Sequence, residues 1–260
     1  DLQAYERRID FREGVLRREL IWRTPAGKRV QVRSTRMVSF TERHLALMTY
    51  EVRLLEGDAP IVISSQIVNK EDFDDYAGRQ AAGSDSDPRK NPGLDHRVLR
   101  SQMSWHSPRR MILGYRVTNS GMTLAVGADH RIETRNMYTE LDDTTEDQGR
   151  KVYRISAKQG QPIVITKAVA YHTSRSVPVR ELSDRVRRTL DRVRESGFDC
   201  HYEAQRQWLA TFWEHSDVSV GATPRIQQTI RWCIFQLAQA AARADGGGIP
   251  AKGLTGDGYE

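Results

Sequence analysis

The last twelve residues hold the densest set of groups that could form a site. They read Ile-Pro-Ala-Lys-Gly-Leu-Thr-Gly-Asp-Gly-Tyr-Glu and end at Glu260. Glycines let backbone amides approach a polar ligand, and the other residues add a charge, a hydroxyl and an aromatic face, as sugar binding requires. On composition alone, a glycine-rich connector remains the simpler interpretation. The small or conformationally permissive residues are Gly253, Thr255, Gly256, Asp257 and Gly258, with Lys252, Tyr259 and Glu260 interleaved.

The rest of the chain lacks the usual catalytic and metal-binding motifs. The seven histidines do not form His-x-His or His-Glu-x-x-His, and there is no Gly-x-Ser-x-Gly or Walker loop. The long polar connection at 69–95 contains four acidic residues between 71 and 75, but they lack the order of a calcium-binding loop. We therefore expect no metal ion and no organic cofactor.

A basic segment at 180–194 raises the question of nucleic-acid binding. It contains six arginines, and the whole chain has a net charge of +6. Opposite charges four residues apart on a helix attract each other. Three such pairs occur here: Glu181–Arg185, Asp184–Arg188 and Arg187–Asp191. We therefore expect a solvated helix face and no nucleic-acid partner.

The elements that must position these residues form a strand-rich part and a helix-rich part. Val, Ile, Leu, Thr and Tyr are enriched in segments bounded by turn residues, which predicts strands. In one of them Ala46, Met48, Tyr50, Val52 and Leu54 share a face, as in a sheet packed on a core. Short turns without intervening helices indicate an antiparallel β-sandwich. The predicted strands are 15–24, 29–39, 45–55, 61–68, 98–106, 111–118, 122–132, 151–157 and 163–171.

Three helices are expected after the strands. Pro178 begins the first and Gly197 ends it, the second covers 199–215, and the third covers 223–244. The third is apolar almost all round, which predicts burial between other elements. Only 16 residues follow it, so we expect the sequence to stop inside a domain. The two cysteines, Cys200 and Cys233, are expected to be reduced and packed, which suits the cytoplasm, and no segment is apolar enough to cross a membrane.

Several stretches together resemble glycoside hydrolase family 65, which contains maltose, trehalose and kojibiose phosphorylases and some hydrolases. The segment 243–260 resembles the start of the family's catalytic domain, and the helix at 227–244 resembles the barrel helix before it. The stretches 10–19, 33–39 and 167–175 resemble strands of the family's sandwich. The resemblance spans nearly the whole chain, and the ending is its most specific part. In that ending, five residues match a segment that resembles the family's active-site entrance, which implies that they lie near the substrate: Lys252, Gly253, Thr255, Gly256 and Tyr259.

The resemblance implies a fold that is mainly β with C-terminal helices. Residues 1–175 would form the antiparallel β-sandwich, without its first strands, and 176–222 a helical linker. Residues 223–260 would begin a truncated (α/α)6 barrel, which is the domain's expected packing partner. A homodimer is also compatible with this organisation.

The resemblance also implies an activity. An α-linked glucose disaccharide such as trehalose or maltose would be cleaved with inversion, with inorganic phosphate as co-substrate in a phosphorylase. The general acid is expected beyond Glu260, so no catalytic residue is assigned within the chain. These 260 residues alone are therefore expected to be an inactive scaffold. The alternative is a stand-alone carbohydrate-binding or assembly module.

Overall fold

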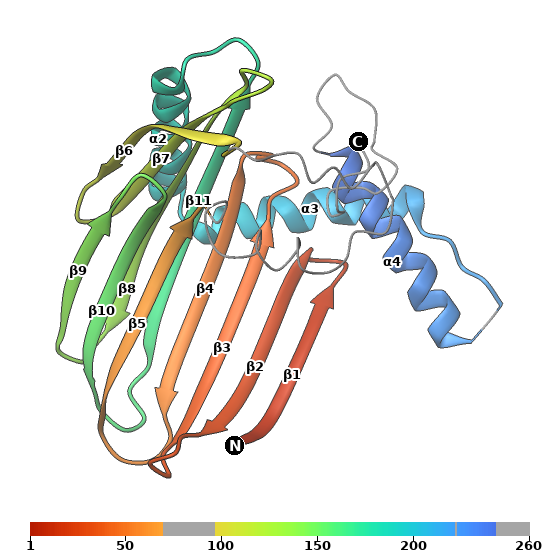
Figure 1. Cartoon of the computed structure of the whole chain (residues 1–260). Helices are drawn as coiled ribbons and strands as arrows, with labels where there is room; N and C mark the ends of the chain where they lie inside the picture. Colours follow the sequence, from red (N-terminus) through yellow and green to blue (C-terminus); the bar gives the residue numbers. More distant parts are fainter. Residues whose placement is uncertain (70–96, 222, 243–260) are drawn as a thin grey trace, which may run out of the picture.

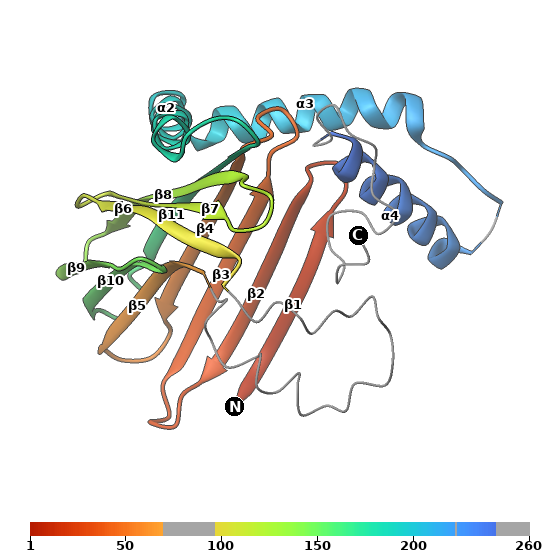
Figure 2. The ribbon, with the colours of Figure 1, turned by 45° about the horizontal axis from the view of Figure 1, so that its top comes forward.

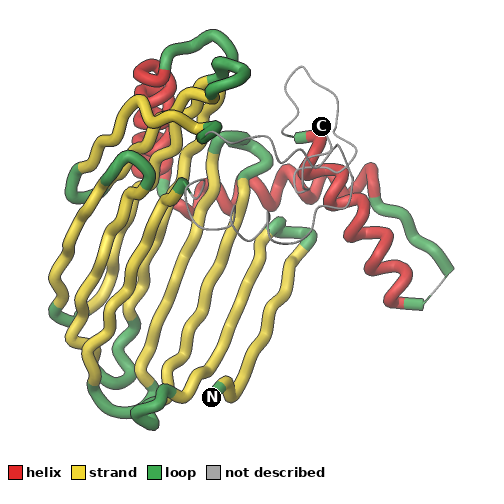
Figure 3. The backbone as a smooth tube through the Cα atoms, viewed as in Figure 1, coloured by secondary structure: helices red, strands yellow, loops and turns green. Residues whose placement is uncertain are grey.

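The computed structural model describes residues 1–69, 97–221 and 223–242, which are mainly β with three helices towards the C-terminus (Figure 3). The strands are β1 (Leu2–Asp10), β2 (Val15–Arg23), β3 (Arg29–Val38), β4 (Leu45–Leu54), β5 (Ala59–Val68), β6 (Leu99–His106), β7 (Arg110–Val117), β8 (Thr123–Thr134), β9 (Tyr138–Thr144), β10 (Gln148–Ala157) and β11 (Ile163–Ser174). The helices are α2 (Val179–Ser196), α3 (Phe198–Ser216) and α4 (Pro224–Ala241).

The strands form two sheets in which every pairing is antiparallel. The larger sheet has eight strands in the order β1-β2-β3-β4-β11-β8-β7-β6, and the smaller has three in the order β5-β10-β9 (Figure 1). The helices α2 and α3 run along one face of the larger sheet, and the smaller sheet covers part of the opposite face (Figure 2). The predicted antiparallel sandwich is confirmed.

The strand β4 shows how the two layers divide the core. Leu45 and Leu47 are buried in a cluster with residues of α2, whereas Val52 and Leu54 are buried in a cluster with residues of β10. Successive side chains point to opposite faces of a sheet, so the buried face changes along this strand. The prediction of a single core face was therefore wrong for the first half of β4. The reason is that helices cover one face there, while the small sheet covers the other face further on.

The sequence pattern did not predict two of the described strands, β1 and β9. Most residues of β1 are exposed, and it is the outermost strand of the large sheet. Most residues of β9 are also exposed, and it is the outermost strand of the small sheet. Edge strands such as these carry charged side chains and little apolar alternation, so the hydrophobic pattern gave no signal.

A buried glutamine anchors α3 to the sheet. The side-chain amide of Gln205 donates to the carbonyl oxygens of Glu13 and Gly14 at 3.0 and 3.1 Å and accepts from the backbone N–H of Phe40 at 3.1 Å. Gly14 has a φ of 64°, and a Cβ at this position would lie 2.6 Å from the Gln205 amide nitrogen. Only glycine permits both the turn and this close approach. The Phe40 ring stacks on Trp208 at 4.6 Å between centroids, which extends the anchor into an aromatic cluster.

The helix α4 leaves one prediction untested, its burial between other elements, and the cysteines correct another. Phe235, Ala238 and Ala240 are buried, but Trp232 and Leu237 are exposed, so within the described residues the helix packs on one side only. It packs against the aromatic cluster through Phe235, whose ring centroid lies 5.3 Å from that of Phe11. The cysteines of α3 and α4 are free, as expected, but exposed rather than packed, because they lie on faces that no described element covers. No helix of the described part has the length and apolar content needed to span a membrane.

Candidate functional site

The candidate residues of the C-terminal segment, Lys252, Gly253, Thr255, Gly256 and Tyr259, lie outside the described residues and stay predictions. The acidic cluster between 71 and 75 also lies outside them. Within the described part, no group of three His, Cys, Asp or Glu residues could hold a metal ion. Two hollows remain as candidates: one beside α2 and one at the edge of the two sheets.

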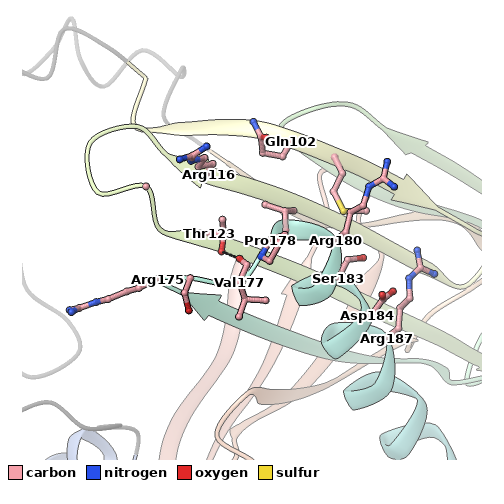
Figure 4. Close-up of a pocket in the computed structure, with 14 residues that line it drawn as sticks. Gln102, Arg116, Thr123, Arg175, Val177, Pro178, Arg180, Ser183, Asp184 and Arg187 are labelled. Atoms are coloured by element: carbon pink, nitrogen blue, oxygen red, sulfur yellow. Dashed lines mark hydrogen bonds between the residues drawn. The ribbon is translucent and has the colours of Figure 1, made fainter.

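The first hollow, here the α2 groove, lies between the first half of α2 and the strands β6, β7 and β8 (Figure 4). Its volume is about 770 Å³, within the range of small-molecule pockets. The lining residues are Gln102, Met103, Arg116, Gly121, Thr123, Arg175, Ser176, Val177, Pro178, Val179, Arg180, Ser183, Asp184 and Arg187.

Side-chain hydrogen bonds fix the loop that leads into α2. The hydroxyl of Ser174 accepts the N–H groups of Ser176 and Val177, and the hydroxyl of Thr123 donates to the Val177 carbonyl at 2.5 Å. The sheet comes close here because β7 has Gly114, where a Cβ would lie 2.4 Å from a methyl of Val179. The loop and the close approach therefore set the position of the first turn of α2, and with it the groove wall.

The groove concentrates positive charge. Arg180 and Arg187 are two turns apart on α2 and extend in the same direction, Arg116 lies at the end of β7, and Arg175 points away from the helix (Figure 4). Asp184 is the one acidic residue among those that line the groove. In the described part of the chain, no carboxylate forms an ion pair with these arginines. The guanidinium carbon of Arg187 instead lies 3.8 Å from the centre of the Trp105 ring.

This arrangement corrects the predicted helix pairs. Arg185 bonds Glu181 at 3.1 Å as expected. Arg188 also bonds Glu181, however, and does not form the predicted pair with Asp184. Asp191 accepts from Arg110 of β7 at 2.8 Å instead of pairing with Arg187. Sequence spacing could not reveal this, because Arg110 reaches the helix from a distant strand.

The second hollow, here the inter-sheet cleft, borders the end of β8 and has a volume of about 800 Å³. At its base Lys151 is 2% exposed, and its ammonium bonds Glu140 at 2.6 Å, Asp142 at 2.8 Å and the Pro108 carbonyl at 2.5 Å. These three acceptors match the three protons of the ammonium group. The buried charge is therefore fully compensated by neighbouring groups.

Next to the cleft, which residues of α2 also line, lies a second compensated cation. Both nitrogens of the Arg110 fork bond the carboxylate of Asp129 at 2.5 and 2.7 Å, and one of them also bonds Asp191. These partners raise the pKa of Arg110, although its burial acts in the opposite direction. A bidentate pair of this kind holds a fixed geometry. It ties β7, β8 and α2 together and leaves no free charge for a ligand.

Histidine and lysine side chains of the same region have perturbed protonation. Burial, with the charges of Lys167 and Lys151, lowers the pKa of His130 to about 3. The Nε2 of His130 lies 2.7 Å from the Ser65 hydroxyl, while its Nδ1 has no hydrogen-bond partner in the described part. Burial also lowers the pKa of Lys167 to about 8. The cleft therefore holds a neutral imidazole near Lys151, whose ammonium is fully compensated.

Among the described residues, neither hollow holds two unpaired carboxyl groups of the kind that glycoside hydrolysis uses. Hydrolysis uses two carboxyl groups that face the scissile bond, one as acid and one as base or nucleophile. The α2 groove has one carboxylate. The cleft has four, those of Asp129, Glu133, Glu140 and Asp199, and the first three form ion pairs with Arg110, Arg131 and Lys151. The groove residues were missed because they come from four separate segments. One signal was present, namely Arg180 and Arg187 at a spacing of seven with Ser183 between them.

Comparison with known proteins gives a consistent result. The model of the N-terminal domain of glycosyl hydrolase family 65 matches residues 1–212. An uncharacterized glycosyl hydrolase of Mycobacterium tuberculosis is 36% identical over 262 residues, which cover 100% of this chain and 32% of that protein. The α,α-trehalose phosphorylase of Thermoanaerobacter brockii and the maltose phosphorylase of Bacillus subtilis are each 26% identical, over 98% and 99% of this chain and 32% of their own lengths.

A solved structure shares the fold. It is described as a kojibiose phosphorylase from the human microbiome and superposes with a TM-score of 0.75 at 15% identity, over 92% of this chain and 29% of that one. The present chain spans about a third of the length of the curated relatives it matches. The chain therefore belongs to glycosyl hydrolase family 65, and its residues 1–212 match the N-terminal domain of that family.

Proposed function

We propose that this chain is the scaffold portion of an inverting enzyme that acts on an α-linked glucose disaccharide such as trehalose or maltose. The observation that carries the proposal is the match along 98–99% of the chain to phosphorylases named for such disaccharides. The described residues offer no pair of free carboxylates facing one hollow. We propose that the general acid is a glutamate of a barrel domain of the full-length protein, and that the substrate-proximal residues are Lys252, Gly253, Thr255, Gly256 and Tyr259.

The exposed side of α4 supports a packing partner for this portion. Ile226 and Leu237 are 50% and 61% exposed, and their spacing places them on the same side of that helix. Large apolar side chains gathered on one exposed helix favour contact with another surface. The helix is also held in place by a two-bonded ion pair, in which Arg231 donates to Asp217 at 2.8 and 2.6 Å. We propose that the barrel domain packs on this side of α4.

The test is an assay of the full-length protein and of residues 1–260 with trehalose, maltose and kojibiose, each with and without inorganic phosphate. Release of glucose 1-phosphate that requires phosphate indicates phosphorolysis, whereas release of glucose alone indicates hydrolysis. We expect turnover by the full-length protein and none by residues 1–260. Turnover by residues 1–260 would contradict the scaffold role. Failure of the full-length protein on every α-linked glucose disaccharide would contradict the substrate class.

The same preparations test the remaining expectations. Light scattering would show whether the full-length protein is a homodimer, and fractionation of cells would test the cytoplasmic location. If residues 1–260 alone retained sugars on a glucan column, the stand-alone carbohydrate-binding module would be favoured instead. We propose that the enzyme uses no organic cofactor, and that inorganic phosphate is the co-substrate if it is a phosphorylase.

A further inference from the structure

The α2 groove differs from the rest of the helix in what its arginines contact. On the solvent side of α2, Arg185 and Arg188 share the carboxylate of Glu181, and Arg192 bonds Glu42 at 3.0 Å. On the groove side, Arg180 and Arg187 make no ion pair with any described residue. Unneutralised guanidinium groups in a hollow attract anions, and their planar fork suits phosphate and carboxylate.

A buried hydroxyl in the same wall has no partner. Ser183 is 2% exposed, and its Oγ makes no hydrogen bond within the described residues, although it lines the groove. It lies on α2 between Arg180 and Arg187 (Figure 4). Buried hydroxyls in proteins are almost always hydrogen-bonded, so an unpaired one beside a hollow indicates an absent partner. A ligand in the groove would supply that partner.

The start of α2 adds further donors. No side chain caps the helix at Pro178, and the first N–H bonded within the helix is that of Leu182, to the Pro178 carbonyl at 3.2 Å. The free amides of a first turn form a partial positive charge that favours anions. This feature acts together with the arginines and Ser183, since all of them border one groove.

The carboxylate of Asp184 narrows the class of ligand. It lies on the same side of α2 as Arg180 and Arg187, so a bare anion would be repelled by it (Figure 4). A carboxylate accepts hydrogen bonds from hydroxyl groups. A ligand with a phosphate for the arginines and hydroxyls for Asp184 satisfies both. The groove, at about 770 Å³, also has room for more than an inorganic phosphate ion.

We propose that the α2 groove binds a phosphate ester of a hydroxylated small molecule, of which a sugar phosphate is the simplest example. Arg180 and Arg187 bind the phosphate with the Ser183 hydroxyl beside it, and Asp184 accepts from the hydroxyls. The proposal is independent of the reaction that the full-length protein performs.

The test is calorimetric titration of the full chain with glucose 6-phosphate, inorganic phosphate and glucose at constant ionic strength. We expect saturable, one-site binding of glucose 6-phosphate, and at least tenfold weaker binding by the double variant Arg180→Gln/Arg187→Gln. The matched control is Arg185→Gln/Arg188→Gln, which removes the same charge from the solvent side of the same helix and should change affinity less than twofold. The single variant Arg180→Gln, whose side chain is exposed, covers the case in which the double variant fails to fold.

The variant Asp184→Asn separates this site from general charge attraction. It should weaken the binding of glucose 6-phosphate, because the carboxylate that accepts from the sugar hydroxyls is altered. It should strengthen the binding of inorganic phosphate, because a repulsive charge is removed. Absence of saturable glucose 6-phosphate binding would overturn the proposal. Equal losses of affinity for glucose 6-phosphate in the groove variant and in its solvent-side control would also overturn it. Tighter binding of both ligands by Asp184→Asn would overturn it as well.

Discussion

The inter-sheet cleft and the α2 groove are similar in volume and both contain several charged side chains, yet they treat those charges in opposite ways. In the cleft, Lys151 bonds two carboxylates and a carbonyl oxygen. In the groove, Arg180 and Arg187 have no carboxylate partner among the described residues, and the Ser183 hydroxyl is unpaired.

The comparison separates charges that stabilise the fold from unpaired charges that are available to bind a ligand. A buried ion without partners costs several kcal/mol, so a compensated network such as that of Lys151 belongs to the architecture. Exposed guanidinium groups stay solvated and cost little when unpaired. A hollow lined by them can therefore keep its charge for binding. The following variants test this difference, beginning with the largest expected effect.

Loss of the Lys151 ammonium should have the largest effect on stability. The variant Lys151→Met leaves Glu140 and Asp142 facing each other without their cation, and we expect a loss of about 3 kcal/mol in the free energy of unfolding. Denaturation in urea measures this. The control Lys158→Met removes a lysine that bonds Asp58 at 2.9 Å on the surface, and it should leave the unfolding midpoint unchanged. An equal loss in both variants would show that the cleft network is not special.

Acidification should destabilise the cleft side through His130. The pKa of this buried imidazole is about 3 in the folded protein against 6.5 for an ordinary histidine, so between these values only the unfolded chain takes up the proton. Stability from this group is therefore complete above pH 6.5 and declines as the pH falls, by up to about 1.4 kcal/mol per pH unit.

Urea denaturation between pH 7 and pH 4 would measure this slope in the protein and in His130→Gln. The variant should show a shallower decline by the share of His130. The control His215→Gln alters a surface imidazole of α3 and should preserve the original slope. Identical slopes in the protein and in His130→Gln would rule out His130 as the source.

Removal of a paired hydroxyl from α2 should lower the free energy of unfolding by about 1 kcal/mol more than removal of an unpaired one. Thr189 is buried and hydrogen-bonds Nε2 of His172 at 3.0 Å, so Thr189→Val should cost about 1 kcal/mol. Ser183 has no partner, so Ser183→Ala should leave stability equal or slightly higher in the absence of ligand. Thermal unfolding of both variants checks the difference. A destabilised Ser183→Ala would mean that its hydroxyl already has a partner in the folded chain.

The groove arginines should matter least for stability. Arg180 is exposed, and Arg180→Gln should change the free energy of unfolding by less than about 0.5 kcal/mol. The variant should nevertheless lose the added thermal stability that glucose 6-phosphate confers on the parent chain. A large intrinsic destabilisation would place Arg180 among the structural charges, as in the cleft.

Much of the fold could be predicted from local patterns. Nine of the eleven strands coincide with apolar, β-branched segments bounded by turns, and Gly197 ends α2 with a φ of 79° as expected. The family resemblance was also carried by short motifs spread along the chain, and the match over residues 1–212 confirms it. The strands β1 and β9 were missed because exposed edge strands need no apolar alternation.

The sequence by itself determined the element types, their order and the family, because these follow from propensity, periodicity and motif. The tertiary structure alone decided which charges are free. Asp191 lies four residues from Arg187, yet it bonds Arg110, which approaches α2 from the sheet. Because this strand-to-helix contact occupies Asp191, Arg187 has no carboxylate partner among the described residues and lies over the ring of Trp105. The groove side of the arginine-rich helix therefore keeps unpaired charge. Helical spacing describes neighbours along one element, whereas the pairing of a side chain depends on every element that packs beside it.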